Sequence, residues 1–90
     1  MNAYKIKLYQ EAIDKWGLAF QALKTSEELG ELLQALSKVC LGKWSKERLA
    51  EEIADVSIML EQLKVAYDLN KRVVELKEIK LKRLEERLKE

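Results

Sequence analysis

Hydrophobic side chains recur every three or four positions through most of this chain, which is the spacing of one face of an α-helix. The pattern predicts four helices. The first ends near Gly17, the second covers residues 19–41, the third runs from Ser45 to about Tyr67, and the fourth follows Asn70. Gly17 is a helix stop signal, and Ser45 and Asn70 are expected helix N-caps.

The second and third helices carry the clearest apolar stripes. The expected core positions are Leu29, Leu32, Leu33, Leu36 and Val39 on the second, and Leu49, Ile53, Val56, Met59, Leu60 and Leu63 on the third. Because the connections are short, neighbouring helices should be antiparallel. We therefore expect an all-α, antiparallel four-helix, bundle-like fold in a single domain over residues 1–90. Apolar residues spread over several faces, so we expect oligomerisation to complete it, as a homodimer or homotetramer.

Composition excludes several classes of protein. Hydrophobic residues make up 48% and charged residues 37%, with no proline and three glycines, which is typical of long helices. The net charge of +1 creates no field for nucleic acid or a membrane surface. There is no bilayer-length apolar run and no signal-peptide pattern, and the single cysteine fits a reducing compartment. We expect a cytoplasmic protein that binds neither nucleic acid nor membranes.

The candidate chemistry lies in two similar acidic decapeptides, EELGELLQAL at residues 27–36 and EEIADVSIML at residues 51–60. Each contains two acids three positions apart, Glu28 with Glu31 and Glu52 with Asp55. At about 100° per residue, both pairs have the same phase relative to their apolar stripes. If those stripes pack antiparallel, the four carboxylates meet at the edge of one interface.

Four clustered carboxylates repel one another and require a counter-charge. Magnesium prefers oxygen ligands and commonly shares its coordination shell with substrate phosphates, and manganese is a potential substitute. The chain has no histidine, which argues against zinc and against di-iron bundles. The small residues Gly30 and Ala54 occupy matching places inside the two pairs and are expected to keep space open there. The alternative is an ordinary solvated acidic surface.

The paired motif resembles the signature of the MazG-type nucleoside triphosphate pyrophosphohydrolases, members of the all-α NTP pyrophosphatase superfamily with the dimeric dUTPases as relatives. The segments KWGLAFQ, EEIADVSIMLEQL and KLKRLEERL are also similar to short MazG-like proteins. The resemblance implies Mg²⁺-dependent hydrolysis of nucleoside triphosphates, including modified and deoxy forms, to a monophosphate and pyrophosphate. It implies that the metal ligands and catalytic acids are Glu28, Glu31, Glu52 and Asp55.

The same resemblance implies that Lys80 and Arg83 face the triphosphate, and that the chains assemble as dimers or tetramers. Either Glu28 or Glu31 is a candidate to orient or deprotonate the attacking water. Trp16 and Gln21 are candidates for base recognition, by stacking and by hydrogen bonding, with core packing as the alternative for the tryptophan. Two rival functions stay open: another phosphate-ester hydrolase, and a non-enzymatic helical oligomerisation or regulatory module with solvated acids.

Overall fold

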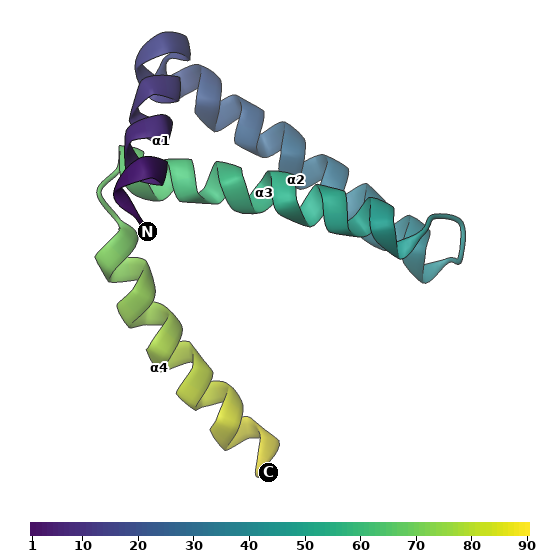
Figure 1. Cartoon of the computed structure of the whole chain (residues 1–90). Helices are drawn as coiled ribbons and strands as arrows, with labels where there is room; N and C mark the ends of the chain where they lie inside the picture. Colours follow the sequence, from purple (N-terminus) through teal and green to yellow (C-terminus); the bar gives the residue numbers. More distant parts are fainter.

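The computed structural model describes all 90 residues and confirms the predicted all-α, four-helix class (Figure 1). Its helices are α1 (Ala3–Trp16), α2 (Leu18–Cys40), α3 (Lys46–Ala66) and α4 (Asn70–Leu88). Helices α2 and α3 lie side by side as an antiparallel hairpin, and α1 crosses α3 near its C-terminal end. Helix α4 leaves that same end and points away from the hairpin. No helix has both the length and the apolar character needed to cross a membrane.

Short-range signals explain most of the helix boundaries. Ser45 is the N-cap of α3 as predicted, because its hydroxyl accepts a hydrogen bond from the backbone N–H of Arg48 at 3.3 Å. The expected capping role of Asn70 is wrong, since α4 begins at Asn70 itself and no side chain caps it. Gly17 alone joins α1 to α2, with φ 89° and ψ 146°, a backbone conformation that side-chain-bearing residues rarely adopt.

Few side chains are buried in this chain, and several of them are polar. The buried residues are Tyr9, Gln21, Thr25, Ala35, Val56, Met59 and Gln62. Ala35 is fully buried on α2, where its small side chain allows a close approach to α3. Near the other end of the hairpin, by contrast, the side-chain amides of Gln21 on α2 and Gln62 on α3 form a buried hydrogen bond between the helices.

The predicted apolar stripe of α2 is confirmed only in part, because Leu32 and Val39 are half-buried but its other three leucines are exposed. Leu29, Leu33 and Leu36 are 44%, 67% and 49% exposed. The inward positions follow the neighbouring heptad-like register and include Gln21, Thr25, Glu28, Leu32 and Ala35. On α3, the predicted core positions Val56 and Met59 are buried, whereas Ile53 and Leu60 are exposed. Helix α2 is therefore turned about its own axis by about one residue position from the orientation that would bury all its leucines. This orientation brings Glu28 into the interface.

The chain is more open than a compact monomer of its mass. Its accessible surface is 7185 Å², whereas a folded 10.5 kDa monomer is expected to expose about 5,400 Å². Its radius of gyration is 15.8 Å, against about 12 Å for a compact domain of this length. Helix α4 contributes most visibly, since it contacts only α3 and every residue from Lys77 onward is exposed. The bundle is not closed within one chain.

Candidate metal centre

Three of the four predicted acids converge at the α2–α3 interface. One carboxylate oxygen from each of Glu28, Glu31 and Glu52 lies within 4.8 Å of the others. Glu28 and Glu31 stand three residues apart on α2, and Glu52 approaches from α3 because the hairpin is antiparallel. Glu28 and Glu52 are partly buried, while Glu31 is exposed. The fourth acid, Asp55, lies one turn beyond Glu52 on α3 and outside this group of three.

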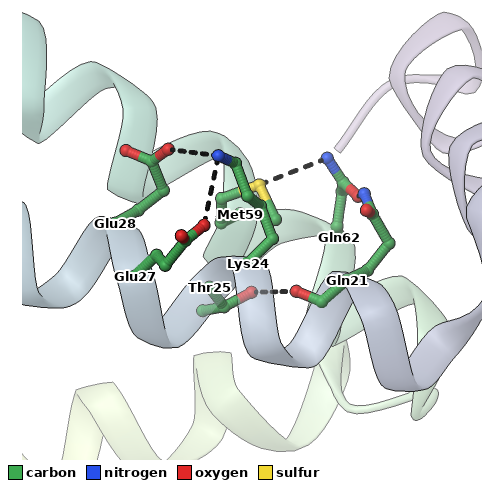
Figure 2. A network of polar contacts seen from close by, with 7 residues as sticks. All are labelled: Gln21, Lys24, Thr25, Glu27, Glu28, Met59 and Gln62. Carbon is green, nitrogen blue, oxygen red and sulfur yellow. Dashed lines mark hydrogen bonds and ion pairs between the residues drawn. The ribbon is translucent and has the colours of Figure 1, made fainter.

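Two carboxylate oxygens at this site are buried without a partner. They are Oε2 of Glu28 and Oε2 of Glu52, neither of which accepts any hydrogen bond. The Glu28 side chain is only 12% exposed, and its other oxygen, Oε1, lies 3.7 Å from Nζ of Lys24 (Figure 2). Buried polar atoms are normally hydrogen-bonded, so these two oxygens are unusual and are available to a cation.

The electrostatics of Glu28 show how crowded the site is with negative charge. Burial raises the pKa of Glu28, and the neighbouring carboxylates of Glu31 and Asp55 raise this pKa further, while Lys24 acts in the opposite direction. Asp55 therefore lies close enough to influence the site although it is outside the group of three. Lys24 is shared, because its Nζ lies 3.2 Å from Glu27 and 3.7 Å from Glu28. One lysine cannot balance this many acids.

A buried polar cluster continues from the acids toward α1 (Figure 2). The side-chain amide Nε2 of Gln21 donates to Oε1 of Gln62 at 2.7 Å. Nε2 of Gln62 contacts Sδ of Met59 at 3.7 Å, and the Thr25 hydroxyl donates to the backbone carbonyl of Gln21 at 2.8 Å. Gln62 and Thr25 are not among the predicted site residues. Gln62 lies seven residues after Asp55 on α3, and Thr25 lies three residues before Glu28 on α2, so this spacing places each on the same helix face as an acid.

The donor set fits a hard divalent cation. All the converging ligands are carboxylates, two of them offer unpartnered buried oxygens, and the chain has no histidine. Mg²⁺ or Mn²⁺ suits such a set, with water or substrate oxygens completing the shell. No protein-family model, curated protein or solved structure matches this chain. Its function is therefore proposed from its own residues and from the resemblance carried by its acidic motifs.

The other predicted site residues lie apart from the acids. Lys80 and Arg83 are on the exposed distal half of α4, and α4 makes no contact with α2. Trp16, at the end of α1, is 53% exposed. Gln21 is 5% exposed and directs its amide at Gln62. A Cβ at Gly30 would meet nothing within 4 Å, so the space beside this residue is open in the single chain.

The raised pKa of Glu28 predicts a pH dependence of stability in metal-free protein. Between the ordinary value of 4.5 and the raised folded value, the folded state binds more protons than the unfolded state. The free energy of unfolding contributed by Glu28 should therefore fall as the pH rises through that interval. Urea denaturation in the presence of a chelator, measured across this pH range for wild type and Glu28→Gln, gives that contribution as a difference.

Saturating Mg²⁺ should reduce the pH-dependent difference in unfolding free energy between wild type and Glu28→Gln, because the cation neutralises the carboxylate in the folded state. Glu27→Gln is the matched control, since Glu27 is the adjacent acid and its side chain is 66% exposed. Identical pH profiles for wild type and Glu28→Gln would contradict the electrostatic account.

Proposed function

We propose that this chain is a Mg²⁺-dependent nucleoside triphosphate pyrophosphohydrolase that releases a nucleoside monophosphate and pyrophosphate. The observation that carries the proposal is the pair of unpartnered buried oxygens of Glu28 and Glu52, within a group of carboxylates contributed by two helices. A solvated acidic surface would not bury carboxylate oxygens without partners. The choice of a triphosphate substrate rests on the resemblance to MazG-type enzymes.

The chemistry divides between the acids and the basic residues. When bound, the metal neutralises phosphate charge and lowers the pKa of a coordinated water. The residues that would hold this metal are the four acids Glu28, Glu31, Glu52 and Asp55. The α2–α3 hairpin fixes their positions before substrate binds. Water attacks the α-phosphorus, the bond from this phosphorus to the α–β bridging oxygen breaks, and pyrophosphate leaves with that oxygen.

Two acids are candidates to accept the proton of the attacking water. Glu31 is the exposed member of the group, so its carboxylate reaches solvent directly. Glu28 lies three residues before Glu31 on the same helix, and its largely buried carboxylate adjoins that of Glu31 in the group. We assign the role to this pair of residues on α2 rather than to one of them.

The proposal gives Lys80 and Arg83 the task of neutralising the phosphate chain. Neither residue makes an ion pair within the chain, and the same is true of Lys82 on this helix. Lys80 and Arg83 are three residues apart and share one side of α4. Because the distal half of α4 contacts nothing in the single chain, these cations act only when α4 lies against an acidic site, in its own chain or in a second one.

We further propose that the chain acts as a homodimer or homotetramer. The exposed surface exceeds that of a compact monomer by about 1,800 Å². Covering this excess on two chains would bury about 3,600 Å² in total, which is within the range of obligate homodimers. The exposed stripe of Leu29, Leu33 and Leu36 and the distal half of α4 are the surfaces to be covered.

The exposed apolar surface alone also supports the second candidate, a non-enzymatic helical oligomerisation or regulatory module. This alternative predicts the same assembly but neither metal dependence nor nucleotide turnover. The buried, unpartnered acid oxygens favour the enzyme.

Hydrolysis is tested with a panel of standard and modified ribo- and deoxynucleoside triphosphates in Mg²⁺, with pyrophosphate and phosphate separated as products. We expect pyrophosphate, and no turnover with a chelator. Glu28→Gln and Asp55→Asn should each lower kcat/KM by at least about a hundredfold while the helices are retained. The control Glu27→Gln should retain activity. Wild-type rates in both site variants would show that the site is misassigned.

Removal of a phosphate-binding cation should cost far more than removal of a solvated one. We expect Lys80→Ala and Arg83→Ala to lower kcat/KM by about ten- to a hundredfold, since a charge-assisted hydrogen bond contributes about 1.5–3 kcal/mol. Lys82→Ala on the same helix should change it by less than about threefold. Equally small effects in all three variants would place α4 outside the active site.

Assembly is tested by sedimentation velocity at micromolar concentration, where we expect a dimer or larger species. Leu33→Asp should shift the population toward monomer, because it places a charge in the exposed leucine stripe. Phe20→Asp is the matched control, since Phe20 is 56% exposed on α2 and points about 140° away from Leu33. A stable wild-type monomer would rule out the proposed assembly.

A further inference from the structure

A groove of about 350 Å³ lies in the corner between α1 and α3. Its walls include Leu8, Ala12 and Trp16 on α1, and Ile58 and Gln62 on α3. Its volume is at the lower end of the range for small-molecule sites, and its lining is mostly apolar with a few polar groups, as is usual for such sites. None of the acidic residues of the metal centre lines it.

The groove adjoins the metal centre along one side of α3. Asp55, Ile58 and Gln62 are spaced three and four residues apart, so their side chains project from the same side of the helix. At 1.5 Å per residue, Ile58 is about 9 Å and Gln62 about 15 Å along the axis from Glu52, the member of the converging group on α3. A phosphate chain held at the acids and extending toward the C-terminal end of α3 would bring the attached nucleoside to Ile58 and Gln62.

Gln62 has hydrogen-bonding capacity that the chain does not use well. Its side chain is held in place, because Oε1 accepts a 2.7 Å hydrogen bond from Gln21. Its Nε2, however, has only the thioether sulfur of Met59 at 3.7 Å, which is a weak acceptor. A ligand oxygen or ring nitrogen in the groove would be a better partner for this amide.

We propose that this groove is the nucleobase subsite, with Trp16 as the stacking surface and Gln62 as the residue that hydrogen-bonds an acceptor on the base edge. This inference rests on the proposed function, because the triphosphate is what connects the groove to the acids. Gln21 is buried outside the groove and is a positioning residue that orients the Gln62 amide. Base recognition is thus assigned to Gln62, a residue 41 positions away from Gln21 in the sequence.

Tryptophan fluorescence reports on this groove without any need for catalysis. The chain has two tryptophans, and Trp44, in the loop that joins α2 to α3, lies 3.6 Å from the guanidinium of Arg48 on α3. In a Trp44→Phe background, Trp16 is the only tryptophan. Titration with nucleosides and nucleoside monophosphates in the absence of metal should give saturable quenching by at least one base.

Gln62→Leu should weaken that binding by about tenfold or more, as expected for a lost hydrogen bond in a buried site. Gln21→Leu should weaken it too, while the rise in Tm caused by Mg²⁺ persists in both variants. Gln10→Leu is the matched control, because Gln10 is exposed and lines a different depression on α1. Trp16→Ala, at a half-exposed position, provides a second variant that should abolish binding as measured by calorimetry.

The two proposals fail in different ways. If nucleosides bind through Gln62 but no triphosphate is hydrolysed, the groove assignment stands and the proposed function is wrong. If triphosphates are hydrolysed but Gln62→Leu and Gln10→Leu have equal KM values, the groove assignment is wrong. The absence of saturable binding by every nucleoside tested would also overturn it.

Discussion

The contact between α2 and α3 is the constraint on which the rest of this structure depends. A purely hydrophobic contact would have used the leucines at positions 29, 33 and 36, yet these are exposed. The register used instead brings Glu28 and Glu52 into the interface with one unpartnered oxygen each. Burying these carboxylates lowers the stability of the hairpin, and a cation bound between them would offset that loss. The polar contact of Gln21 with Gln62 follows from the same register.

This register also determines what is left outside. The leucine stripe of α2 and the distal half of α4 stay uncovered in the single chain. In the proposed assembly these surfaces supply the hydrophobic stabilisation that the polar interior of the hairpin lacks. The proposed function and the proposed assembly therefore both depend on which face of α2 is turned toward α3. Turning the leucines of α2 toward α3 would turn its acids toward solvent.

Sequence periodicity predicted the helices well because their stop and cap signals are local, as Gly17 and Ser45 show. Spacing also predicted that Glu28, Glu31 and Glu52 would meet, since helical phase is preserved on folding. It failed on Leu29, Leu33 and Leu36, because hydrophobicity favours burial of leucines whether the partner is α3 or another chain. It failed on Gln62 as well, because the bond from Gln21 joins two helices and is not visible in either segment alone.

The junction at Gly17 has a mechanical consequence for the groove. Helix α1 forms one wall, and a single residue with φ 89° and ψ 146° joins that wall to α2, whose acids anchor the proposed phosphates. No loop intervenes to absorb a change in angle. The torsion angles of this glycine therefore set the angle at which α1 leaves α2, and the hydrogen bond from Tyr9 to Glu61 fixes α1 against α3. A side chain at position 17 would strain the junction, and a change in its torsion angles would displace the N-terminal end of α1 more than Trp16, which adjoins the glycine.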